Sequence, residues 1–143
     1  MVYEKTLNYT KLVIHRNGGP AQIAASESVS VSVHTSTTTI GTSATTPVYT
    51  TKLWDSHGAF DLATGTFTAP SPGEYVLEAK YQGGNVSSSS ANTFVYAEAV
   101  KNSTAVGQTA FTYQVSSVSL GPNGLLVQPV KLLAGETLKF QLT

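Results

Sequence analysis

The three histidines are the residues of this chain best suited to bind a transition metal or to transfer a proton near neutral pH. His15, His34 and His57 lie in separate segments, and none follows the His-x-x-x-His spacing that places two imidazoles on one metal. The chain has no cysteine, which excludes thiol nucleophiles, zinc ribbons and disulfides. We therefore interpret His15, His34 and His57 as surface histidines, with His57 in a turn. The sequence predicts no bound metal and no cofactor.

The eight acidic residues could bind calcium or provide the carboxylate pair of a glycoside hydrolase. Asp55 and Asp61 could surround a cation together with Glu78 or Glu136, but the Asp-x-Asp-x-Asp-Gly spacing of a calcium loop is absent. No acidic pair stands out, and Gly-x-Ser-x-Gly and phosphate-binding motifs are absent. The sequence therefore favours turn-capping carboxylates and predicts no enzymatic activity, with a small hydrolase as a disfavoured alternative.

Aromatic side chains offer another chemistry, the stacking of sugar rings on an exposed surface. Trp54, Tyr49, Tyr81 and Tyr113 could line such a surface. Aromatic residues at strand spacing more often belong to a core or to a subunit interface. Glycan binding is therefore kept as an alternative interpretation.

The charge balance bears on possible partners. Eight basic and eight acidic residues give a formal net charge of zero, and only 11% of residues are charged. No basic surface for nucleic acid or for an anionic membrane is predicted, and no apolar run has the length of a signal peptide or membrane span. A surface with so little charge repels copies of itself weakly, which fits a protein that functions in an assembly.

Short alternating runs of Val, Thr, Tyr and Phe, broken by Gly, Pro, Asn and Ser, predict one all-β domain of about eight or nine strands. Within residues 28–34 the valines share one face, and residues 75–81 and 137–142 also place their apolar side chains on one face. Pro129 interrupts a long apolar stretch and predicts either an edge strand or a bulge, because proline cannot donate to a ladder.

A sharp corner is predicted within FDLATGTFTAPSPGEYVLEAKY, residues 60–81. Proline fixes φ and glycine accepts positive φ, so the Pro and Gly residues of this segment turn the chain between two strands that begin with a phenylalanine and a tyrosine. The motif consists of Gly65, Phe67, Pro70, Pro72, Gly73 and Tyr75. Taken alone, it predicts only a β-corner.

The order Phe-Asp-x-x-Thr-Gly-x-Phe-Thr-Ala-Pro-x-Pro-Gly-x-Tyr in this segment resembles the signature of the C1q/TNF-like jelly-roll superfamily. Residues 94–111 resemble the family's strand that ends in a Lys-Asn turn, and residues 125–140 resemble its apolar strand, its Leu-x-x-Gly-Asp/Glu turn and the strand that follows. The resemblance spans about residues 29–140. It implies an all-β jelly-roll β-sandwich that forms a homotrimer.

The resemblance also implies a trimer interface, because the family packs aromatic and aliphatic residues of its inner strands along the threefold axis. The corresponding residues are Tyr75, Leu77, Tyr81 and Phe140. A register slip of one residue would exchange this interface with the exterior.

The N-terminal segment, residues 1–28, extends beyond the resemblance. The family continues past its Gly-Asp/Glu turn with further strands, whereas this sequence ends at Thr143, so one or two core strands are expected to be missing. Residues 29–143 are predicted to form the jelly roll, and residues 1–28 either an added strand or an arm that reaches a neighbour. As an arm, the segment would anchor through Tyr3, Leu7, Tyr9, Leu12 and Ile14.

A short chain that starts at Met1 without a signal peptide, collagen-like repeat or stalk resembles the family's bacteriophage versions. This implies a non-enzymatic virion structural protein, made in the host cytoplasm. We expect a trimeric decoration or cement protein on the capsid surface, which binds major capsid protein subunits through residues 1–28. The alternative is a receptor- or glycan-binding head domain of a phage fibre, with loops 35–47 and 82–90 contacting a host glycan.

Overall fold

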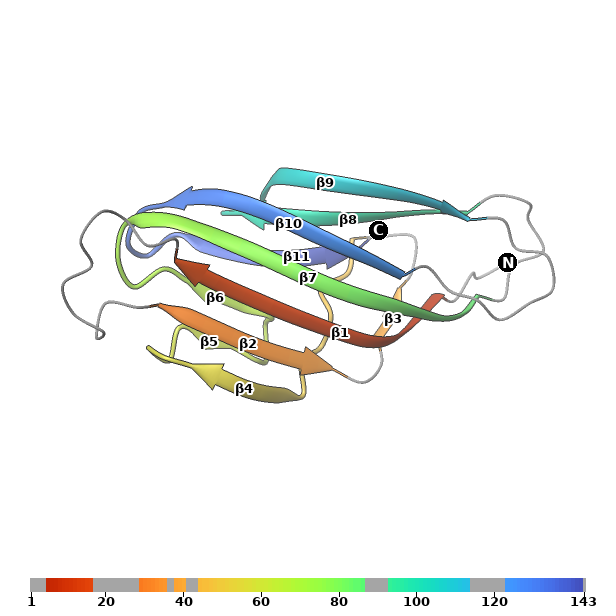
Figure 1. Cartoon of the computed structure of the whole chain (residues 1–143), viewed down its shortest axis with the longest axis horizontal. Coiled ribbons are helices and arrows are strands. Elements are labelled where there is room, and N and C mark those ends of the chain that lie inside the picture. Colours follow the sequence, from red (N-terminus) through yellow and green to blue (C-terminus); the bar gives the residue numbers. More distant parts are fainter. Residues whose placement is uncertain are drawn as a thin grey trace.

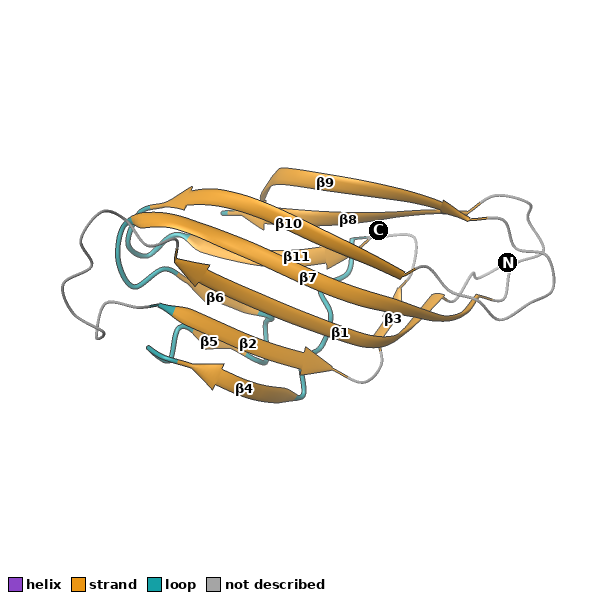
Figure 2. Cartoon of the chain, in the orientation of Figure 1, coloured by secondary structure: helices purple, strands orange, loops and turns teal. Residues whose placement is uncertain are grey.

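The structure is a computed structural model that describes residues 5–16, 29–35, 38–40, 44–86, 93–113 and 123–142. Every regular element in these residues is a β-strand, and the strands form two antiparallel sheets packed face to face (Figures 1 and 2). The prediction of an all-β sandwich is therefore confirmed.

Strands far apart in the sequence are neighbours in both sheets. Sheet A has the order β10 (Asn123–Leu132), β7 (Gly73–Val86), β1 (Lys5–Arg16), β2 (Ser30–Thr35), β4 (Thr51–Asp55), and β3 (Thr38–Ile40) pairs with β1. Sheet B has the order β5 (Phe60–Asp61), β6 (Thr66–Thr68), β11 (Thr137–Leu142), β8 (Thr93–Lys101), β9 (Thr104–Tyr113). The strand β10, which contains Pro129, lies at an edge of sheet A, as predicted.

The core lies between the two sheets and follows the period of two that a strand imposes. The side chains at alternate positions of β2, β7 and β11 point inward, so the predicted apolar faces within residues 29–33, 75–81 and 138–142 are confirmed. The largest fully buried side chains are Tyr75, Tyr81, Phe67, Phe140, Leu12, Ile14, Leu77, Leu138, Leu142 and Val31.

The N-terminal strand β1 lies inside sheet A, between β2 and β7. Leu12 is opposite Val33 on one side and Ala79 on the other, and both Leu12 and Ile14 are fully buried. Of the two alternatives for this segment, residues 5–16 therefore form an added strand. Leu12 and Ile14 are wrong as anchors, because side chains enclosed in the core cannot contact another protein.

The other three residues proposed for the anchoring arm lie wholly or partly outside the described residues. Tyr3 lies outside the described residues. Leu7 and Tyr9 belong to the backbone of β1, but their side chains lie outside the described part.

The residues assigned to a trimer interface also require correction. The core encloses all four of them, namely Tyr75, Leu77, Tyr81 and Phe140. Tyr81 and Phe140 stack across the two sheets, with ring centroids 5.8 Å apart. On β7 the residues that face outward are those at the positions between Tyr75, Leu77 and Tyr81. A register shift of one residue exchanges inward-facing and outward-facing side chains in this way.

Candidate functional site

The corner motif carries the chain from sheet B to sheet A. Gly65 has φ of 65°, and a Cβ atom at this position would lie 2.6 Å from Cγ2 of Thr46. Phe67 is buried beside Tyr75, with ring centroids 5.4 Å apart. The Tyr75 hydroxyl donates a hydrogen bond to the Ser71 carbonyl at 2.7 Å, which closes the turn. These residues shape the fold, whereas Pro70 and Pro72 are exposed in the turn.

The three segments that carry the family resemblance meet at one end of the sandwich. The Gly135 amide donates to the Ala69 carbonyl at 2.8 Å, and the Ala69 amide donates to the Glu136 carbonyl at 2.9 Å. The Asn102 side chain accepts from the Thr137 amide at 2.9 Å and donates to the Glu136 carboxylate at 2.9 Å. The corner and the turns at residues 101–104 and 133–136 therefore form one hydrogen-bonded unit.

Within this unit, the Glu136 carboxylate is held by protein groups. It forms an ion pair with Lys101 at 2.8 Å and accepts a hydrogen bond from the Leu133 amide at 2.8 Å. These two interactions lower the pKa of the Glu136 carboxyl below its ordinary value. Glu136 thus links the turn at residues 101–104 to the turn at residues 133–136 through its carboxylate.

The second carboxylate candidate, Asp55, caps the turn after β4. Its side chain is almost fully buried and accepts from the amides of Ala59 at 2.8 Å and Phe60 at 3.2 Å, and Lys52 pairs with it at 2.8 Å. Burial alone would raise the pKa of Asp55, but the hydrogen bonds from Lys52 and the two amides outweigh it, and the pKa lies below its ordinary value.

Replacing Asp55 with asparagine is expected to lower the free energy of unfolding near neutral pH by about 1–2 kcal/mol, because charge-assisted hydrogen bonds are lost. A carboxyl whose folded pKa is depressed stabilises the fold above its unfolded pKa of about 3.9, and this contribution disappears as pH falls through the folded pKa. The free energies of unfolding of Asp55→Asn and of the original chain, measured with urea, should therefore differ at about pH 7, and the difference should shrink as the pH falls below about 3.9 and through the folded pKa. If the difference in the free energy of unfolding stayed constant with pH, the carboxylate charge would be excluded as its cause.

The structure does not bring the other metal-ligand candidates together. His15 and His34 lie on β1 and β2, His57 follows β4, and Asp61 accepts a hydrogen bond from the Ala63 amide at 2.8 Å. Among the described residues, no three His, Asp or Glu side chains are grouped so that they could hold a metal ion.

The aromatic candidates are also separated. Tyr49 and Tyr81 are buried in the core, and the Tyr113 side chain lies outside the described part. Trp54 is 60% exposed, on edge strand β4. The four residues therefore do not form one glycan-binding surface, and Trp54 is considered separately below.

Apolar side chains are exposed on the outer face of sheet A, over β10, β7 and β1. Leu125 and Val127 are 58% and 49% exposed. The register places Val127 beside Glu78 on β7, and Glu78 beside Val13 on β1. We call this surface the association face and define it by Leu125, Val127, Pro129, Val76, Val13 and Glu78.

The outer face of sheet B carries polar side chains on β11 and at one position of the β8–β9 pair. On β11 it presents Thr137, Lys139 and Gln141, and the Glu98 carboxylate on β8 accepts a hydrogen bond from Gln108 on β9 at 2.8 Å. Two large apolar side chains are also exposed in sheet B, Tyr96 on β8 and Val106 on β9, at 36% and 39%.

The association face was not singled out in the sequence, although a signal for it exists. Leu126 and Val130 point into the core, while Leu125 and Val127 point outward from the same strand. The signal is the run of apolar residues at both inward and outward positions of this strand.

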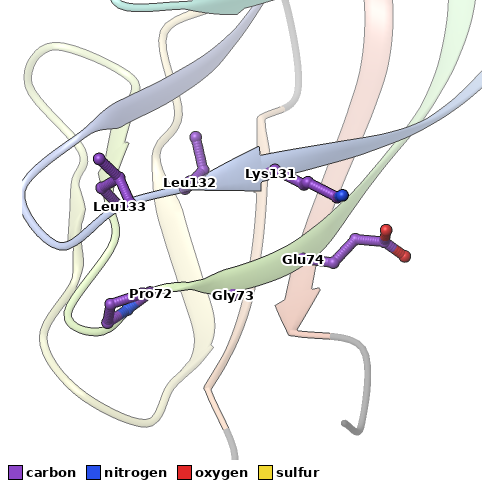
Figure 3. Close-up of a pocket in the computed structure, with 6 residues that line it drawn as sticks. All are labelled: Pro72, Gly73, Glu74, Lys131, Leu132 and Leu133. Carbon is purple, nitrogen blue, oxygen red and sulfur yellow. The ribbon is translucent and has the colours of Figure 1, made fainter.

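A depression of about 320 Å³ opens at one end of the sandwich, where β7 begins and β10 ends. Pro72, Gly73, Leu132 and Leu133 supply most of its lining (Figure 3). Glu74 and Lys131 extend in the same direction from adjacent strands at its rim, and their backbones are paired in the ladder (Figure 3).

Comparisons with protein-family models, with curated proteins and with solved structures find no match to this chain. No helix in the described ranges is long and apolar enough to span a membrane. Inference about function therefore depends on the corner, the turns and the association face of this chain itself.

Proposed function

We propose that the chain is a jelly roll that associates into a homotrimer and serves as a structural protein of a bacteriophage virion. The strand order supports the jelly roll. After β6 in sheet B, the chain crosses to β7 in sheet A, returns to β8 and β9 in sheet B, and crosses again to β10 and back to β11. Such crossing between two antiparallel sheets is typical of jelly rolls. In this proposal, β1 replaces one of the strands that the resemblance leaves missing.

The single observation that carries the trimer is the association face. Leu125 and Val127 are exposed on the same face of β10, and their burial against another copy would contribute roughly 25 cal/mol for each Å² of apolar surface. Glu78, at the centre of the face, and Lys80, beside Leu125, provide one charge of each sign. A second copy with complementary charges could therefore cover the face without leaving a buried charge unpaired.

A threefold ring requires each copy to contribute two different surfaces, because its interfaces are heterologous. The edge strand β9 offers the second surface. Its sequence, TAVGQTAFTY, has no charge and no proline, and Val106 is 39% exposed. The edges β4 and β10 instead carry Lys52 and Lys131, which discourage strand pairing. We therefore propose that the association face of one copy meets the β9 edge of the next.

In the virion, the proposed role is mechanical. A trimer at a threefold site would bridge neighbouring capsomers and add interface that must break before the shell expands or ruptures. Since the proposed anchors Leu12 and Ile14 are enclosed in the core, the contact with major capsid protein subunits is assigned to the depression beside Leu133. The support for the virion setting is the family resemblance.

Substituting Leu125→Lys and Val127→Lys together is expected to reduce the solution mass from three chains to one, because two buried cations would oppose association. The same variant should be lost from purified particles that retain the original chain. A double substitution at exposed positions away from the association face and β9, Thr50→Lys with Thr68→Lys, is the matched control and should leave the mass at three. Circular dichroism checks folding. Trimers that persist in the Leu125/Val127 variant would contradict the proposed interface.

A further inference from the structure

An exposed, immobilised tryptophan lies at the edge of sheet A opposite the β10 edge. Trp54 belongs to β4, which pairs with β2 at one edge of the molecule (Figure 1). The indole is 60% exposed, and its Nε1 donates a hydrogen bond to the Ser30 hydroxyl at 2.8 Å. This bond fixes the ring, so a ligand that stacks on it does not have to order the side chain.

Polar groups continue from the fixed indole into the turn that follows β4. The Ser30 amide donates to the Ser56 hydroxyl at 3.0 Å, and the Ser56 amide donates to the Ser30 carbonyl at 3.1 Å. The Ser56 hydroxyl lies 2.7 Å from Nδ1 of His57. A flat apolar ring and an exposed hydroxyl–imidazole pair are thus held by one hydrogen-bonded chain of residues.

The charges next to this cluster compensate each other. Lys52 and Asp55 flank Trp54 in the sequence and form an ion pair at 2.8 Å. No unpaired cation is therefore supplied by these neighbours for a phosphate or carboxylate. A purely apolar partner would in turn remove the Ser56 and His57 side chains from water without replacing their hydrogen bonds. The cluster suits a ligand that is neutral and has one apolar face with polar groups around it.

We propose that Trp54, Ser30, Ser56 and His57 form a binding site for a neutral pyranoside. The C–H face of the sugar ring stacks on the indole, and ring hydroxyls hydrogen-bond to the Ser56–His57 pair. Because the site is open on one side, a monosaccharide binds weakly, with Kd of about 1–10 mM, and a repeating polysaccharide gains by multivalency. This inference does not depend on the association face, which lies over β10, β7 and β1.

Trp54 is the only tryptophan, so the intrinsic tryptophan emission of the full chain reports on this site alone. Methyl β-glucopyranoside, methyl β-galactopyranoside and methyl β-N-acetylglucosaminide are titrated against it, with sorbitol as an acyclic control. We expect a saturable shift in emission with at least one glycoside and none with sorbitol. The absence of a saturable shift with all three glycosides, or an equal effect of sorbitol, would overturn the proposal.

Variants are then compared by saturation-transfer NMR with the glycoside that binds. Trp54→Ala should abolish the transfer to sugar ring protons, and Ser30→Ala should weaken binding about 3- to 10-fold, because it releases the indole. Leu53→Ala changes an exposed apolar neighbour on the same strand and should bind normally. Binding that survives in Trp54→Ala would overturn the site. A change of solution mass in Trp54→Ala would instead assign the indole to a subunit interface and also overturn it.

Discussion

Removing residues 1–16 is expected to abolish cooperative folding. This deletion takes away β1, which lies between β2 and β7, together with the fully buried Leu12 and Ile14. Loss of one buried leucine or isoleucine side chain alone costs about 2–5 kcal/mol, and an ordinary domain has a total stability of roughly 5–15 kcal/mol. The three strands that pair with β1, namely β2, β3 and β7, would also lose their ladder partner. The expected readout is the absence of a sigmoidal transition in urea or heat, followed by circular dichroism.

Removal of residues 1–4 is the matched control, since β1 begins at Lys5. This shorter deletion should leave the unfolding transition in place. A cooperative transition in the chain without residues 1–16 would mean that the segment is an external arm after all, and that another part of the chain completes sheet A.

Substituting Gly65→Ala is expected to lower the free energy of unfolding by roughly 2–5 kcal/mol, the sum of about 1–2 for a left-handed backbone and about 1–3 for overpacking. Gly65 has φ of 65°, and the added Cβ would lie 2.6 Å from Thr46 and 3.2 Å from the Tyr49 ring. The Tyr49 ring is buried and packs edge-on against Phe60 at 5.4 Å, so it has little room to move.

Gly58→Ala provides a control with almost the same backbone and no crowding. Gly58 has φ of 61°, and a Cβ atom there meets nothing within 4 Å. Only the backbone cost of about 1–2 kcal/mol should remain. Chemical denaturation of both variants measures their free energies of unfolding. Equal losses of stability in the two variants would show that crowding by Thr46 and Tyr49 is not the reason for a glycine at position 65.

Local patterns predicted the sandwich because they reflect the strand period directly. The alternating valines of residues 29–33 and the apolar parity of residues 138–142 each identify one buried face. Pro129 likewise marks an edge, because it lacks the amide proton. The corner was readable for the same reason, since proline and glycine restrict φ at the residues where the chain changes sheets.

The interface could not be read in the same way. Tyr75, Leu77 and Tyr81 are apolar at alternate positions, and a period of two does not say whether that face meets the chain's own second sheet or another copy. The association of β1 with sheet A also depends on long-range pairing to β2 and β7, which no local pattern encodes. The exposure of Trp54 follows from its place on an edge strand, which its aromatic character alone does not predict.

The solution mass of the full-length chain, measured by native mass spectrometry or light scattering, tests the central claim most directly. A mass of three chains at micromolar concentration is the predicted result, and it would make the association face the surface to map next. A single-chain mass across the accessible concentration range would contradict the trimer and the capsid role proposed for it.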